Sequence, residues 1–376
     1  MDDLNQNPKL GSADRPNSYI GRSVPRERAK KLLEGKGKYV DDILLPRMVH
    51  LSYIRSPFAH AKIKSINTEN AKKIPGVLNV FTIDDIEKVC TPWQGVLGHL
   101  GEMRSPTQYP LAKDVVRWQG EPVAVVVANK RAVAEDALEL VEIDYEDLDA
   151  QLDMETAMDK STKVIHDDLG NNLFWTRTVN QGDVSEAFKQ SHIVEEVTLD
   201  FARHTGVTLE TRAIVADWDS SEERMTIYHN GQAPHMMQSI IAKHLNISEG
   251  LVRIISCDVG GSFGIKVHVY PDEMVTVAVS KLLKRPVKFV ADRLESYSTD
   301  IHSRCHKISG KIGVDDKGKI LAFEIDDLSG IGPFSVYPRT SAIETNQVLN
   351  LSAASYVVPN YKAKGTVVFQ NKTPMC

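Results

Sequence analysis

The feature that most constrains the fold is a strand-like run followed at once by a helix-like run, over residues 121–141. The run EPVAVVVA (121–128) is almost continuously apolar and β-branched, which is typical of a strand buried on both faces. The next residues, NKRAVAEDALELV (129–141), place apolar side chains at helical spacing. Because such a strand needs cover on both sides, the chain is expected to fold into several layers of helix and sheet.

Alternating segments around this unit predict an α/β domain over residues 19–150. Its other strands are expected where apolar and polar side chains alternate, at residues 48–56, 62–67 and 77–82. The polar residues 1–18 predict a flexible tail, and the polar stretch 151–180 predicts a connector that few contacts cross.

Residues 181–376 predict a second domain, of α+β type, so the fold class of the whole chain is α+β. Strands are expected at 193–201, 213–219, 224–231 and 251–259, and helices at 182–190, 233–246 and 271–286. Pro234 and Pro271 stand in the first turns of the two longer helices, where proline is well accommodated. Asp183 or Ser185 is a candidate cap for the helix at 182–190.

The composition excludes several classes of function. A net charge of −5 gives no basic surface for nucleic acid. No apolar run reaches the ~18 residues of a membrane span, and the polar N-terminal stretch lacks a secretory signal. The four cysteines form no CxxC pair and fit neither zinc nor iron–sulfur spacing: Cys90, Cys257, Cys305 and Cys376. We therefore expect a cytoplasmic protein with reduced thiols and no direct metal ligand.

The sharpest local motif is the turn Gly260-Gly261-Ser262-Phe263-Gly264-Ile265-Lys266, placed between a predicted strand and a predicted helix. Glycines let the backbone approach a ligand closely, and successive amides in such a turn form a concavity for anionic oxygens. A strained structural turn and a phosphate-cradling turn both remain open. A Walker or Rossmann loop does not fit, because the glycine spacing differs from both motifs. Phe263 is expected to bury its ring.

A second motif, Asn230-Gly231-Gln232-Ala233-Pro234-His235, ends one predicted strand and opens a helix. Gln232 could present its amide to a ligand beside the free amides of the first helical turn, or it could simply cap the helix. His235 has no second metal-ligating residue at helical spacing, which argues against a metal site there.

The order of segments along almost the whole chain resembles the large subunits of xanthine oxidase-type molybdenum hydroxylases. This family includes carbon monoxide dehydrogenase, aldehyde and glyceraldehyde oxidoreductases, nicotinate dehydrogenase and xanthine dehydrogenase. The similar segments are residues 20–63, 74–86 and 119–148, which look like a hammerhead domain, and residues 231–235 and 256–296, which look like the first molybdenum-cofactor domain. The resemblance thus implies a hammerhead-like domain over 19–150 and a molybdopterin-binding domain over 181–376.

The resemblance also assigns roles to matching positions. Gln232 is similar to the glutamine that hydrogen-bonds the apical oxo ligand of molybdenum. Gly261, Ser262, Phe263 and Gly264 resemble the turn whose backbone holds the cofactor, with Ser262 replacing a usual glycine. Purine-specific members carry Glu where this chain has Val267, which argues against a purine substrate. Glu210 and Arg212 are expected to form a buried ion pair. Residues 261–264 and Gln232 should converge on one centre.

No catalytic residue is expected in this chain. The family's general-base Glu, which serves the insertion of a water-derived oxygen into a C–H bond, lies beyond a segment resembling residues 371–376. The resemblance therefore implies a split subunit or a truncation, with a split gene better fitting the sequence. It implies molybdenum–molybdopterin, in the cytosine dinucleotide form, and a second molybdopterin-binding chain. A [2Fe–2S] chain and an FAD chain would complete the complex.

Several functions stay open at this stage. An aldehyde such as glyceraldehyde is the first expected substrate, followed by carbon monoxide or an N-heterocycle such as nicotinate. A non-catalytic molybdopterin carrier or maturation module is the alternative from another class. A phosphate-binding enzyme that uses the glycine turn directly is the third.

Overall fold

The computed structural model describes residues 19, 23–26 and 29–376, in which residues 1–38 and 39–376 form separate units. The described part of the first unit holds one short helix, α1 (Ala29–Leu33). The tail predicted over 1–18 lies outside the described residues. No helix in the described part of the chain is long and apolar enough to cross a membrane.

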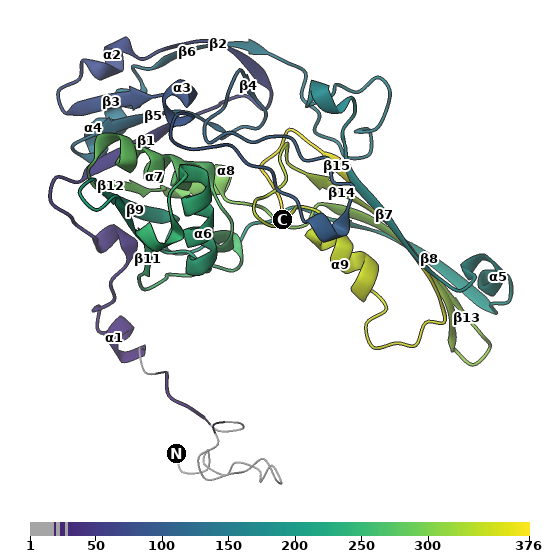
Figure 1. Ribbon diagram of the computed structural model, residues 1–376. Helices are drawn as coiled ribbons and strands as arrows, with labels where there is room; N and C mark the ends of the chain where they lie inside the picture. Colours follow the sequence, from purple (N-terminus) through teal and green to yellow (C-terminus); the bar gives the residue numbers. More distant parts are fainter. Residues whose placement is uncertain (1–18, 20–22, 27–28) are drawn as a thin grey trace. The chain divides into compact units, whose positions relative to one another are not determined.

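The second unit contains a seven-stranded mixed sheet, seen at the left in Figure 1. Its strand order is β11 (Val252–Ser256), β10 (Arg224–His229), β9 (Ala213–Asp219), β12 (Val287–Val290), β1 (Val49–Arg55), β5 (Pro122–Ala128) and β3 (Val77–Phe81). Every residue of β5 is buried. Val125 and Val127 pack into the main core, whereas Val126 and Ala128 pack into a second core on the other face. The prediction of a strand covered on both sides is confirmed.

Helices cover the two faces of this sheet. The main core contains side chains from α6 (Pro234–Leu245) and α7 (Pro271–Leu283), which both begin at the predicted prolines. On the other face α4 (Arg131–Leu138) contributes Ala134 and Ala137. The mixed arrangement of helices and sheets confirms the predicted α+β class.

The two predicted domains share the seven-stranded sheet. Strands β1, β5 and β3 come from residues 19–150, and the other four come from residues 181–376. They join where β1 pairs in parallel with β12, with Val49 opposite Val287 and His50 opposite Lys288. No local sequence pattern predicts this strand pairing, because the paired residues lie more than 200 positions apart in the sequence.

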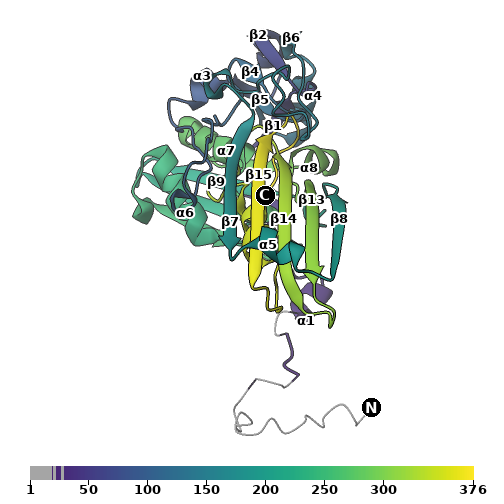
Figure 2. The same ribbon diagram turned by 90° about the vertical axis from the view of Figure 1, so that its right-hand side faces the viewer.

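A second, five-stranded sheet runs beside the first, and Figure 2 shows its long strands side by side. The order is β7 (Leu173–Gln181), β15 (Asn360–Phe369), β14 (Ile320–Ile331), β13 (His306–Val314) and β8 (Ile193–Phe201). Strand β7 falls within the predicted connector, where Phe174 and Trp175 are buried. The connector prediction is therefore wrong for residues 173–180, because two aromatic side chains anchor an otherwise polar stretch in a core.

The remaining elements are short. A three-stranded sheet consists of β4 (Val115–Val116), β2 (Ala61–Asn67) and β6 (Glu142–Asp147). The other helices are α2 (Glu69–Lys72), α3 (Ile83–Ile86), α5 (Val184–Lys189), α8 (Arg293–Thr299) and α9 (Ile343–Leu351). Asp183 caps α5 by accepting a hydrogen bond from the Glu186 amide at 3.0 Å, as one of the two predicted caps.

Candidate functional site

The glycine turn after β11 presents a row of unused main-chain donors. Gly261, Phe263 and Gly264 all have positive φ, of 102°, 53° and 96°. Within the described residues, the amides of 261–264 donate no hydrogen bond. A Cβ on Gly264 would meet no atom within 4 Å, so the space beside the turn is open there. Four free donors in succession form a cradle for an electron-rich group.

Gln232 lies against this turn. The main-chain amide of Gln232 donates a hydrogen bond to the Lys266 carbonyl at 2.9 Å, and this bond joins the two segments directly. Gly231 leaves no room for a larger residue, because a Cβ there would lie 2.3 Å from the His229 ring. The Gln232 side chain is exposed, and its carboxamide makes no hydrogen bond within the described part of the chain. The side-chain carboxamide of Gln232 is thus available beside the free main-chain amides of the turn.

Glu210 holds the start of the turn in place. One oxygen, Oε2, accepts from the Gly260 amide at 2.8 Å and from Lys266 Nζ at 3.0 Å. The Lys266 side chain is 1% exposed, and burial lowers its pKa although Glu210 opposes that effect. The Lys266 carbonyl also accepts a hydrogen bond from the main-chain amide of Gln232. Lys266 therefore links the glycine turn to both Glu210 and Gln232.

Arg212 sits in a separate buried cluster of charges. It is bidentate to Asp272, at 2.6 and 3.0 Å, and its Nε donates to Asp300 at 2.7 Å. The Tyr270 ring lies 3.7 Å from the guanidinium, and the Tyr270 hydroxyl donates to the Ile265 carbonyl. The expected pair between Glu210 and Arg212 is therefore wrong. Each has a better partner from a distant segment, and the planar guanidinium matches two carboxylates at once.

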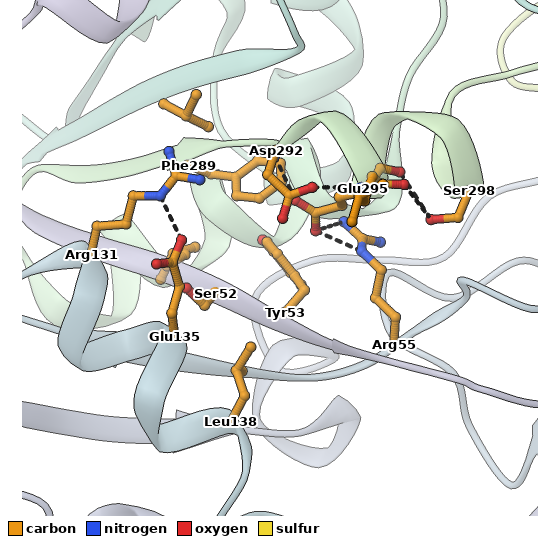
Figure 3. A pocket seen from close by; sticks show the side chains of 13 residues that line it. Ser52, Tyr53, Arg55, Arg131, Glu135, Leu138, Phe289, Asp292, Glu295 and Ser298 are labelled. Carbon is orange, nitrogen blue, oxygen red and sulfur yellow. Dashed lines mark hydrogen bonds and ion pairs between the residues drawn. The ribbon is translucent and has the colours of Figure 1, made fainter.

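The charge cluster continues toward the surface through Arg55, shown in Figure 3. Arg55 donates to Asp272 at 2.8 Å and to Glu295 of α8 at 2.7 Å. It borders a cavity of about 300 Å³ that Arg131 and Glu135 of α4 also line. Since Arg131 and Glu135 pair with each other, as Arg55 and Glu295 do, this cavity offers no unsatisfied arginine to a ligand.

A second cavity adjoins the glycine turn and is called the turn-side cavity here. It measures about 340 Å³, and its lining includes Phe263, Gly264, Val267, His268, Arg339 and Gln347. Phe263 is 77% exposed, so its expected burial is wrong for the described residues. The left-handed backbone at Phe263 directs the ring out of the protein core, where another group can pack against it.

Two parts of this site carried no signal in the sequence. The Glu210–Lys266 pair joins residues 56 positions apart, and nothing local marks them as partners. Arg339 reaches the turn-side cavity from a loop that follows β14, in a segment without a recognisable motif. Both depend on tertiary contacts that a single sequence does not reveal.

Family comparisons match almost the whole described chain. Residues 34–149 match the aldehyde oxidase and xanthine dehydrogenase a/b hammerhead domain. Residues 165–376 match the molybdopterin cofactor-binding domain, which contains both segments of the site.

Individual proteins show the same similarity. The chain is 34% identical to the nicotine 6-hydroxylase large subunit of Paenarthrobacter nicotinovorans, over 98% of this chain and 45% of that protein. It superimposes on quinoline 2-oxidoreductase from Pseudomonas putida 86 with a TM-score of 0.89 and 31% identity, over 95% of this chain and 45% of that one. It is 28% identical to the nicotinate dehydrogenase large molybdopterin subunit of Eubacterium barkeri, over 94% of this chain and 79% of that protein. The chain thus spans about 45% of the length of the first two proteins.

Proposed function

Because this chain belongs to the xanthine oxidase-type molybdenum hydroxylases, as part of their large subunit, we propose that it holds a molybdenum–molybdopterin cofactor at residues 261–264 and Gln232. The observation that carries the proposal is the row of four free amides at 261–264, one hydrogen bond away from the Gln232 segment. A row of this kind suits the oxygen-rich end of a molybdenum cofactor. The bound cofactor would supply two-electron chemistry that replaces C–H by C–OH with oxygen from water.

The chain's own residues position and orient that group. The amides of 261–264 and the Gln232 carboxamide would donate hydrogen bonds to it. Glu210 and Lys266 fix the turn from behind, at 2.8 and 3.0 Å. Since Gly264 faces open space, the cofactor can approach its backbone closely. The general-base Glu would come from polypeptide outside this sequence.

The partners we propose follow the family's organisation. A second molybdopterin-binding chain would complete the cofactor site, and a [2Fe–2S] chain and an FAD chain would carry electrons away. The relative of which this chain covers 79% is named as the large molybdopterin subunit of nicotinate dehydrogenase. We further propose the cytosine dinucleotide form of the cofactor. We also propose a cytoplasmic location, where thiols such as those of Cys90, Cys305 and Cys376 stay reduced.

For the substrate, we propose an N-heterocycle. The three proteins compared above are named for nicotine, quinoline and nicotinate, which are all N-heterocycles. This favours an N-heterocycle, and carbon monoxide is the second candidate because two carbon monoxide dehydrogenase large chains are 30% and 31% identical to this chain. Val267 in the turn-side cavity is apolar, which suits an aromatic ring better than the polar edge of a purine.

The proposal is tested by purifying the native complex and measuring molybdenum, iron and flavin per copy of this chain. We expect all three to be present, together with reduction of an artificial electron acceptor that depends on quinoline or nicotinate. A metal-free protein from the native source, with its partners absent, would contradict the proposal.

Gly264→Ala gives a sharper test because the chain offers a matched control. Gly264 and Gly318 both have positive φ and both face open space, but Gly318 lies in the remote turn between β13 and β14. Alanine should cost about 1–2 kcal/mol of backbone strain at either position. Only Gly264→Ala should also place a methyl group against the cofactor, and we expect its molybdenum content to fall roughly tenfold. Equal molybdenum contents in the two variants would contradict the assignment.

A further inference from the structure

Building on the proposed function, we propose that the turn-side cavity binds the substrate and that Arg339 selects a substrate carrying a carboxylate group on an aromatic ring. The cavity shares Phe263 and Gly264 with the proposed cofactor turn, so a molecule inside it would lie beside the cofactor. Its volume of about 340 Å³ suits a small ligand.

The charges lining the cavity leave one cation uncompensated. Glu344 is the one acidic residue of its lining, and it already binds Arg304 through both the Arg304 amide and the guanidinium. In addition, His306 Nε2 lies 3.5 Å from Glu344 Oε2. Arg339 has no carboxylate partner among the described residues. A guanidinium in this position favours a planar carboxylate, which it can bind with two parallel hydrogen bonds.

A buried histidine provides a second polar contact. His268 is only 6% exposed, and its Nδ1 makes no hydrogen bond within the part of the chain that the structure describes. Burial, assisted by Arg339, lowers the pKa of His268 to about 4, so the ring is neutral at pH 7. A buried polar atom without a partner is costly unless a ligand or water satisfies it. His268 can therefore fix the orientation of a bound molecule without adding charge.

One part of the lining is apolar and can hold a flat apolar body. Ile265, Val267 and Ile343 line the cavity together with the exposed Phe263 ring. An aromatic ring stacks well against such surfaces. The combination of an apolar wall, neutral polar side chains and one guanidinium without a carboxylate partner matches an aromatic carboxylate better than a neutral heterocycle or a small aldehyde.

The test compares two probes of equal size, benzoate and benzamide, which differ in charge. Their dissociation constants would be measured by isothermal titration calorimetry on the native complex at pH 7. We expect benzoate to bind roughly tenfold tighter or more, as a charge-assisted bidentate contact implies. In Arg339→Gln the two constants should become similar. Arg253→Gln, which removes an exposed arginine on β11 that does not line the cavity, should leave the preference unchanged.

A second variant tests the same charge balance from another position. Val267→Glu places a carboxylate in the cavity, so it should weaken benzoate strongly and benzamide little. If benzoate shows no preference, or if the preference survives in Arg339→Gln, the inference is overturned. Molybdenum content measured on the same samples separates the two proposals. A molybdenum-containing complex without benzoate preference refutes only this inference, whereas a preference in a molybdenum-free protein refutes only the proposed function.

Discussion

Replacing Arg212 with alanine is expected to lower the free energy of unfolding by about 3–5 kcal/mol. Arg212 is fully buried and satisfies Asp272 and Asp300, which are themselves 2–3% exposed. Without the guanidinium, these carboxylates stay buried with their charge only partly balanced by Arg55. The midpoint of guanidinium denaturation of the purified protein measures the loss.

Two comparison variants make this expectation specific. Arg131→Ala breaks the exposed pair with Glu135 on α4 and should cost only about 0.3–0.5 kcal/mol. Arg212→Lys keeps the charge but loses the planar guanidinium that binds both Asp272 and Asp300. Its loss in the free energy of unfolding should lie between those of Arg212→Ala and Arg131→Ala. Similar denaturation midpoints for Arg212→Ala and Arg131→Ala would show that the buried cluster contributes little.

The cluster also gives a direction for the pH dependence of stability. Burial raises the pKa of Asp272, but Arg212 and Arg55 outweigh it and lower the pKa to about 2, below the ordinary 3.8. The resulting stability is present above pH 3.8 and is lost as the pH falls toward 2. Burial raises the pKa of Asp300 despite Arg212, so Asp300 does not add to this loss. Asp272 therefore dominates, because two arginines bind it.

The sequence predicted elements with a strong periodic pattern and missed those without one. Strand β5 and helices α6 and α7 were found because their apolar spacing and first-turn prolines are local signals. Helix α9 was missed, since only Thr345 and Leu349 are buried in it. Strand β7 was missed because its second half is mostly polar, where it pairs with residues of β15 that are alternately buried and exposed. The parallel pairing of β1 with β12 depends on the whole fold.

The candidate site divides in the same way. Gln232 and residues 261–264 stand in recognisable motifs, and the structure places the two segments in contact through the Lys266 carbonyl. The surroundings were not predictable, because nothing in the sequence favours Lys266, 56 positions away, over the nearby Arg212 as the partner of Glu210. Only the folded chain shows that Lys266 is its partner. A conformation such as the left-handed backbone of Phe263 is equally invisible without the turn around it.

Glu210→Gln is expected to reduce the molybdenum content of the native complex by roughly tenfold or more while the protein stays folded. Glutamine keeps the shape and can still accept from the Gly260 amide, but it removes the charge that balances buried Lys266. The ammonium group must then lose its proton or leave the interior, and either change loosens the contact that joins the turn to Gln232. Metal analysis per chain and the denaturation midpoint, measured on the same samples, separate loss of cofactor from loss of fold.

Glu295→Gln is the matched control for this substitution. The Glu295 side chain is 14% exposed and pairs with Arg55, and the Glu210 side chain is 15% exposed and pairs with Lys266. Both variants break an ion pair whose carboxylate is similarly buried, but Glu295 lies on α8, beside the cavity in Figure 3 rather than beside the glycine turn. We expect comparable losses of stability and a loss of molybdenum only in Glu210→Gln. If Glu295→Gln loses as much molybdenum, the effect belongs to general stability, and Glu210 has no special part in shaping the turn.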